Sequence, residues 1–173
     1  VVLLALFQMT GCEENFMGRQ YDTDEEYMQI YDYVKTRPEL SIYKEICDYS
    51  GFYSQISTAG TYTVFAPVDS AWQKFYKELK ITDFKEKTPE YWLMYMQYAA
   101  LETMIHTNSL NGGKMTTYTM LDKSYYLSAD VSSYSAIKLI NSSVITESNI
   151  ELKNGYLNLI DAVLEPPVTP VYD

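Results

Sequence analysis

The chain has 173 residues, of which 23 are acidic, 13 are basic and one is a histidine, so its formal net charge at pH 7 is −10. A chain of this length corresponds to one domain of about 150 residues with a short appendage, and it can bury a sizeable core. Hydrophobic residues make up 47% and charged residues 21%, which excludes an intrinsically disordered chain. Acidic residues outnumber basic residues, and the sequence shows no cluster of basic residues that could bind phosphates. We therefore expect no nucleic-acid partner.

The first residues have the features of an export signal. An uncharged apolar run over residues 1–7 is followed by Gln8 and Met9, then by the small residues Thr10 and Gly11, which fit a signal cleavage site, and then by Cys12. This order resembles the bacterial lipobox, in which the cysteine is lipidated and becomes the new N-terminus. The resemblance implies that residues 1–11 are a signal-peptide remnant and that residues 12–23 are the lipidated cysteine and its tether. A buried N-terminal strand with a core cysteine is the alternative.

Two acidic residues, Glu13 and Glu14, directly follow this cysteine. They resemble the signal that sends lipoproteins of Bacteroidetes-type bacteria to the outer cell surface. The resemblance implies an outer-membrane location, lipid-anchored through Cys12 and facing the cell exterior. A solvated linker is the plainer interpretation, and the two are compatible. Lipidation leaves Cys47 without a disulfide partner, so we expect it to be a small buried residue on a helix.

Helical spacing of apolar residues dominates the next part of the chain. The expected N-caps are Asp24, either Asp69 or Ser70, and Thr88, each followed by an apolar stripe. The last of these helices is dense in aromatic residues and methionine, which favours a central, buried position. The predicted helices cover residues 25–37, 40–50, 71–79 and 89–105.

Strand patterns dominate after His106. β-Branched and aromatic residues alternate in short runs, and Asn-Gly dipeptides at 111–112 and 154–155 indicate turns. Two consecutive prolines end the domain and leave residues 168–173 as a tail. Helices early and strands late predict the α+β class. The predicted strands cover residues 62–65, 136–140, 144–145 and 156–164.

Two segments resemble the signature sequences of the fasciclin domain. Residues 60–72 resemble the first signature, in which a Thr-Val-Phe-Ala-Pro strand leads into a capped helix. Residues 154–166 resemble the second, at the end of the domain, and His106 lies where the family has its central histidine. The resemblance covers residues 37–167. It implies a fasciclin-like domain over residues 24–167, a wedge-shaped β-sandwich with its helices packed early in the chain.

Physical chemistry accounts for the signature residues as parts of a scaffold. Pro67 ends strand pairing because it lacks an N–H donor, and Asp69 caps a helix. Asn154 and Gly155 supply a turn with positive φ, and Asp161 satisfies backbone donors or a hydroxyl near the core. The residues expected to have structural roles are Phe65, Pro67, Asp69, His106, Asn154, Gly155 and Asp161.

The sequence departs from the family pattern at three positions. Fasciclin domains that bind integrins carry a Tyr-His pair and an Asp-Ile pair, but Ile105 replaces the tyrosine here and Asn149 replaces the aspartate. We therefore do not expect integrin binding. The second signature commonly has histidine where this chain has Asn158.

No catalytic motif stands out in the sequence. It contains no phosphate loop, no paired-cysteine metal motif and no histidine pair spaced for zinc, so we expect no metal, no cofactor and no enzymatic activity. His106 is expected to be a hydrogen-bonded residue in or near the core. The residue counts allow a Ser-His-Asp catalytic triad around His106, or a pair of catalytic carboxylates of the glycosidase type. No motif indicates which residues would form either one.

The 18 tyrosines are the remaining candidates for a binding surface. Exposed aromatic side chains stack on sugar rings or anchor protein interfaces. Packing inside the sandwich is the alternative for any one of them. The expected binding surface consists of Tyr118, Tyr125, Tyr126 and Tyr134, and a second possible group consists of Tyr49, Tyr53 and Tyr62.

These observations predict a non-catalytic, surface-anchored lipoprotein that acts as an interaction module. The first hypothesis for its partner is an outer-membrane nutrient importer of the SusC/SusD kind, with this chain as an accessory protein. The alternative is a free-standing adhesion or glycan- or peptide-binding lipoprotein.

Overall fold

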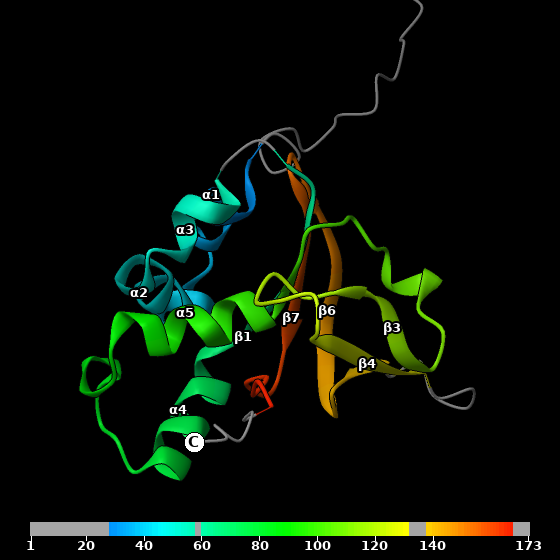
Figure 1. Cartoon of the computed structure of the whole chain (residues 1–173). Coiled ribbons are helices and arrows are strands. Elements are labelled where there is room, and N and C mark those ends of the chain that lie inside the picture. Colours follow the sequence, from blue (N-terminus) through cyan, green and yellow to red (C-terminus); the bar gives the residue numbers. More distant parts are fainter. Residues whose placement is uncertain (1–27, 58–59, 132–137, 168–173) are drawn as a thin grey trace, which may run out of the picture.

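A computed structural model describes residues 28–57, 60–131 and 138–167 (Figure 1). Most helices come before the strands in the chain, which confirms the α+β class expected from the sequence. The five α-helices of the described ranges gather on one side of the long pair of strands β6 (Ser143–Leu152) and β7 (Gly155–Ile160), and the strands β3 (Gly113–Tyr118) and β4 (Tyr126–Val131) lie on the other side (Figure 1). None of the helices in the described ranges has both the length and the apolar character needed to cross a membrane.

Two helix boundaries lie where local signals place them, but α1 begins at Ile30 with Gln29 as its N-cap, and the expected cap Asp24 lies outside the described residues. α2 ends at Gly51, whose φ of 75° is left-handed. Thr88 caps α5, because its hydroxyl accepts a hydrogen bond from the Tyr91 N–H at 3.3 Å. The helical elements are α1 (Ile30–Val34), η1 (Pro38–Leu40), α2 (Ser41–Ser50), α3 (Phe52–Ile56), α4 (Asp69–Leu79), η2 (Phe84–Glu86), α5 (Pro89–Tyr98) and η3 (Thr107–Ser109).

The prediction that the α5 helix continues to residue 105 was wrong. The helix ends at Tyr98, and Ala100–Leu101 form a short strand, β2, antiparallel to β1 (Tyr62–Pro67). The Phe65 N–H donates to the Ala99 carbonyl at 2.9 Å, so pairing with β1 replaces the next helical turn. Tertiary pairing therefore overrides the helical pattern at this point.

Within the described residues, seven strands form one continuous hydrogen-bonded sheet in the order β2-β1-β7-β6-β5-β4-β3. The pairing of β1 with β7 is parallel, and the other pairs are antiparallel. The start of β6 pairs with β5, and the rest pairs with β7 across two register shifts. The remaining strands are β3 (Gly113–Tyr118), β4 (Tyr126–Val131), β5 (Lys138–Ile140), β6 (Ser143–Leu152) and β7 (Gly155–Ile160).

The two faces of the β1–β7 pair are covered by different layers, because side chains alternate along a strand. Val64 and Leu157 belong to a core shared with the helices. Phe65 and Ile160 belong to a second core, shared with residues such as Leu127 on β4. The helices therefore cover one face of the central strands, and the outer part of the sheet covers the other face. This is the sandwich arrangement that the resemblance implied.

Asp69 caps a helix, but not the helix predicted. The N-cap of α4 is Val68, and Asp69 lies in the first turn. Its carboxylate reaches α2 instead, where it accepts hydrogen bonds from the Ile42 N–H at 2.9 Å and the Ser41 hydroxyl at 2.5 Å. Asp69 therefore satisfies an unpaired donor in the first turn of a helix that is distant in sequence.

Candidate functional site

The residues expected to carry the lipid and the export signal lie outside the described residues. They are Cys12, Glu13 and Glu14, and Tyr134 of the expected binding surface lies outside them as well. Their roles stay predictions. The other candidate residues have defined positions.

The Asn-Gly dipeptide joins β6 to β7, but the two loop residues are Lys153 and Asn154, and Gly155 is the first residue of β7. Gly155 has a φ of +147°. A Cβ at this position would lie 1.9 Å from the Tyr62 carbonyl oxygen. Glycine is thus required both by its backbone conformation and by the close approach of β1.

Asn154 is buried and connects three elements. Its side-chain oxygen accepts from the Ile30 N–H at 2.8 Å, and its amide nitrogen donates to the Ile56 carbonyl at 2.6 Å. Its own carbonyl accepts from the Tyr62 N–H at 2.9 Å. One turn residue therefore holds the ends of α1, α3 and β1 together.

The remaining signature residues also have scaffold contacts. The Asp161 carboxylate accepts from the Val144 N–H at 2.8 Å and from the Ser143 hydroxyl at 3.2 Å, which fits the role expected for it. Phe65 is buried in the core between the sheet layers. Pro67 is the last residue of β1, as its missing N–H predicts.

His106 is hydrogen-bonded, but the expectation of a core or near-core position was wrong. The residue is exposed and forms the N-cap of η3, where its ring Nδ1 accepts from the Asn108 N–H at 3.2 Å. Its ring contacts Tyr156 edge-on, with 5.6 Å between the centroids. Within the described chain, no carboxylate is hydrogen-bonded to His106, so these contacts supply no catalytic triad.

Two of the three departures from the family pattern, Asn149 and Asn158, form a polar network of their own. Asn149 accepts from the Thr107 N–H at 2.7 Å and donates to the Thr107 hydroxyl at 2.8 Å. An aspartate could not donate the second bond. The buried Asn158 accepts from the Asn149 N–H at 2.9 Å. These asparagines attach the segment after His106 to β6 and β7.

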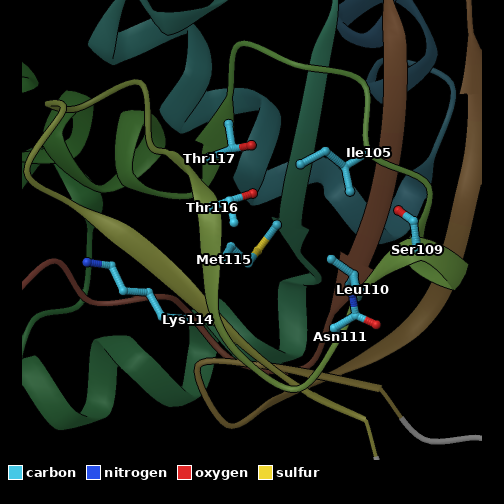
Figure 2. Close-up of a pocket in the computed structure, with 8 residues that line it drawn as sticks. All are labelled: Ile105, Ser109, Leu110, Asn111, Lys114, Met115, Thr116 and Thr117. Carbon is cyan, nitrogen blue, oxygen red and sulfur yellow. The ribbon is translucent and has the colours of Figure 1, made fainter.

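A pocket of about 290 Å³ lies between this segment and β3 (Figure 2). Met115, Thr116 and Thr117 follow one side, and Ser109, Leu110 and Asn111 face them from the other (Figure 2). Lys114 is the only charged side chain among the described residues that line it. The pocket offers hydroxyl and amide groups for binding, but its lining contains no acid–base pair for proton transfer.

The expected tyrosine surface is divided between two faces. Tyr118 on β3 pairs directly with Tyr126 on β4. The Lys114 ammonium lies 3.7 Å from the Tyr126 ring centroid, and that of Lys123 lies 5.9 Å from the Tyr118 centroid. Tyr118 is 38% exposed. We call these four residues the tyrosine face: Tyr118, Tyr126, Lys114 and Lys123.

The other tyrosines considered from the sequence have separate environments. Tyr125 contacts Tyr98 edge-on at 6.3 Å, away from the tyrosine face. Tyr62 is buried, and the Tyr49 hydroxyl donates to the Lys87 carbonyl at 3.2 Å. Tyr53 is 42% exposed and lies beside Tyr31. The second possible group is therefore not a shared surface.

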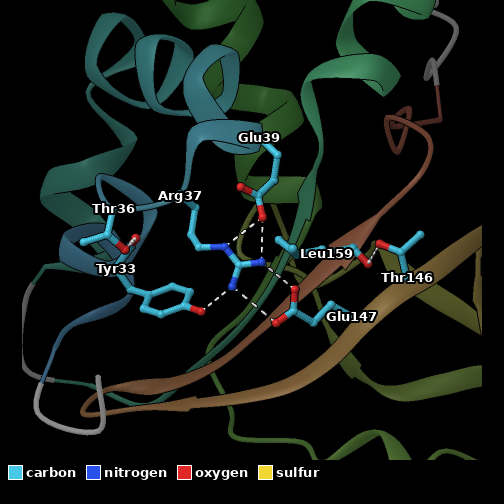
Figure 3. A network of polar contacts seen from close by, with 7 residues as sticks. All are labelled: Tyr33, Thr36, Arg37, Glu39, Thr146, Glu147 and Leu159. Atoms are coloured by element: carbon cyan, nitrogen blue, oxygen red, sulfur yellow. Dashed lines mark hydrogen bonds and ion pairs between the residues drawn. The ribbon is translucent and has the colours of Figure 1, made fainter. Parts of the chain in front are cut away.

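The charged cluster around Arg37 serves the scaffold (Figure 3). Its guanidinium forms ion pairs with Glu39 and Glu147, each at 2.6 Å, and donates to the Tyr33 hydroxyl. The hydrogen bond from Arg37 lowers the pKa of Glu39. Because Arg37 precedes η1 and Glu147 lies on β6, the cluster attaches the helical layer to the sheet.

Neither a reactive thiol nor a metal centre is found in the described part. Cys47 is fully buried on α2, and this burial raises the pKa of its thiol, which disfavours the reactive thiolate. Across the described ranges, no three His, Cys, Asp or Glu side chains gather closely enough to hold a metal ion.

The fold and these motif residues define a fasciclin-type domain. The family model of the fasciclin domain matches residues 38–166, and the chain therefore belongs to this family. The structure is similar to that of a FAS1 domain pair from the insect cell adhesion molecule fasciclin I. The TM-score is 0.56 at 17% sequence identity, and the match covers 75% of this chain and 46% of the other. The likeness shows a shared fold.

Among curated proteins, the chain is similar to Stabilin-2 of mouse (Mus musculus) and of rat (Rattus norvegicus). Each is 28% identical over 132 residues, which is 76% of this chain. The chain spans only 5% of the mouse protein and 9% of the rat protein. The similarity therefore concerns the domain.

Proposed function

We propose that this protein is a non-catalytic interaction module that a lipid on Cys12 holds at the exterior face of an outer membrane. Membership of the fasciclin family supports an adhesion-type role, since a structural relative is described as a cell adhesion molecule. The apolar run before Cys12, together with Glu13 and Glu14 after it, supports the anchor and the location.

The tyrosine face is the observation that carries the binding role. Two paired aromatic rings, each near a lysine, form an amphipathic surface on β3 and β4, at one edge of the sheet. Tyrosine is enriched in interface hot spots because its ring has a large contact area and its hydroxyl can bond. The proposed partner is an importer of the SusC/SusD kind, to which this chain is an accessory; a free-standing adhesin or a glycan- or peptide-binding lipoprotein is the second candidate.

Replacing Tyr118 and Tyr126 together with alanine should reduce recovery of a partner by about tenfold or more, as expected for hot-spot residues. The measurement is mild detergent extraction of native outer membranes, capture of the tagged chain and quantitative mass spectrometry. Tyr53→Ala is the matched control, because this tyrosine is also exposed but lies on another surface. Equal recovery with the double variant would contradict the assignment of this face.

The captured proteins decide between the two candidate partners. Stoichiometric recovery of an importer barrel and its lid lipoprotein supports the accessory role. Recovery without them supports the free-standing role, and binding of the wild-type chain to glycan and peptide panels is then compared with the double variant.

Cys12→Ser should abolish incorporation of labelled palmitate and release the protein from the membrane fraction. Several buried acyl chains are needed for stable anchoring, since each buried CH₂ contributes only about 0.8 kcal/mol. Protease treatment of intact cells tests orientation at the same time. A wild-type chain that carries no label, or one that is protected in intact cells, would contradict the anchor or the exterior location, respectively.

A further inference from the structure

A groove lies between α5, the segment that connects β3 to β4, and the last described residues. It is distinct from the tyrosine face and from the pocket beside β3. Its volume is about 380 Å³. Among the described residues that line it, none carries a charge. The lining consists of Tyr91, Met94, Tyr95, Leu121, Tyr125, Pro166 and Pro167.

Two tyrosines on α5 form an ordered aromatic wall. Tyr91 and Tyr95 are one helical turn apart, and their ring centroids are separated by 4.9 Å. Their hydroxyls share a hydrogen bond of 2.9 Å. Tyr95 is only 8% exposed. Rings that are already held in place can bind a partner without a large loss of side-chain entropy.

The chain already places proline rings against this wall. Pro166 is buried and Pro167 is exposed, and both line the groove. A polyproline II segment has no internal hydrogen bonds, so its carbonyls are free to accept from groups such as tyrosine hydroxyls. Aromatic-lined grooves recognise such segments because the extended helix is formed before binding.

A negative charge beside the groove indicates which type of residue would stand next to the prolines of a ligand. Glu165 is exposed and immediately precedes the two prolines. Burial is the largest cause that raises the pKa of Tyr95, and the nearby charge of Glu165 acts in the same direction. A basic residue next to the prolines of a partner would therefore face a carboxylate.

We propose that this groove binds a proline-rich segment of a partner protein in the polyproline II conformation, with a flanking arginine or lysine near Glu165. The groove adds a contact surface to the interaction module, and its assignment does not depend on the tyrosine face.

The probe is a synthetic acetylated peptide, Arg-Pro-Pro-Val-Pro-Pro-Val-Pro, titrated into the isotopically labelled full chain. It should bind with a Kd below about 1 mM and shift the amide signals of α5 and of residues 121–125. The same peptide with alanine in place of every proline should not bind. These shifts map the site without any change to the protein.

Met94→Lys tests the groove directly, because this side chain lines it and is 37% exposed. An ammonium group in the apolar groove should weaken binding about tenfold. Met104→Lys is the matched control, since Met104 is 39% exposed but does not line the groove. Glu165→Gln should weaken binding about fivefold for the arginine peptide only, not for a version with alanine in place of arginine.

Absence of binding up to about 1 mM would overturn the proposal, as would equal affinity for the alanine peptide or for the Met94→Lys variant. Binding only to a variant that ends at Pro167 would assign the groove to residues 168–173 of this chain and would also overturn it. Amide shifts confined to the tyrosine face would place peptide binding elsewhere and would reject this groove.

Discussion

Gly155→Ala is expected to cost more than about 4 kcal/mol, which is exceptional for one substitution and a large part of the stability of a typical domain. The added Cβ would lie 1.9 Å from the Tyr62 carbonyl oxygen and 2.7 Å from its carbonyl carbon. These are backbone atoms of β1, so no rotation of a side chain can relieve the overlap. The left-handed φ of +147° adds strain for any residue with a Cβ.

Urea unfolding of the purified chain measures this effect. Gly112→Ala is the control, because a Cβ at Gly112 meets nothing within 4 Å. The control should be neutral or stabilising by up to about 1 kcal/mol, since alanine reduces the entropy of the unfolded chain. Similar midpoints for the two variants would show that β1 and β7 do not approach each other as closely as described.

Asn154→Ala is expected to destabilise the domain by about 2–6 kcal/mol. The substitution leaves the Ile30 N–H and the Ile56 carbonyl without their side-chain partner, and each unsatisfied buried group costs about 1–3 kcal/mol. The carbonyl of residue 154 can still accept from the Tyr62 N–H. The loss should therefore affect the attachment of α1 and α3 more than the sheet.

Hydrogen exchange and urea unfolding together test this expectation. Asn154→Asp should destabilise the domain at least as strongly, because a buried carboxylate oxygen would face the Ile56 carbonyl oxygen to which the amide donated. Asn111→Ala, at an exposed asparagine, should change the stability by less than about 0.5 kcal/mol. Unaltered exchange at Ile30 in Asn154→Ala would rule out the bridging role.

Local signals predicted much of the fold correctly. The Thr88-Pro89 start of α5, the Gly51 end of α2 and the strand that ends at Pro67 all depend on neighbours in sequence. Helix caps and proline effects act within one turn or one strand pair, so a single sequence is enough to recognise them. The ordered signature segments also identified the fasciclin family, which the family match to residues 38–166 confirms.

The functional candidates were harder to place. The sequence grouped three described tyrosines, but only Tyr118 and Tyr126 share a face, and Tyr125 instead lines the groove next to α5. Strand register decides which side of a sheet a residue faces, and a shift of one position reverses it. The β6–β7 pair has two register shifts and the β3–β4 pair has one. Neither the composition nor the alternation of apolar and polar residues along the sequence predicts them.

The sequence by itself determined the α+β class, the family, the signature residues and a few element boundaries, such as the start of α5 and the end of α2, because these follow from short-range backbone preferences and ordered motifs. Only the tertiary structure decided that Asp69 caps α2, that α5 ends at Tyr98 and that His106 is exposed. Each of these depends on a contact between segments far apart in the chain, and such contacts compete with local preferences of similar energy. The proline-lined groove arises in the same way, where α5 meets residues 166 and 167. The tyrosine face instead depends on the local pairing of β3 with β4.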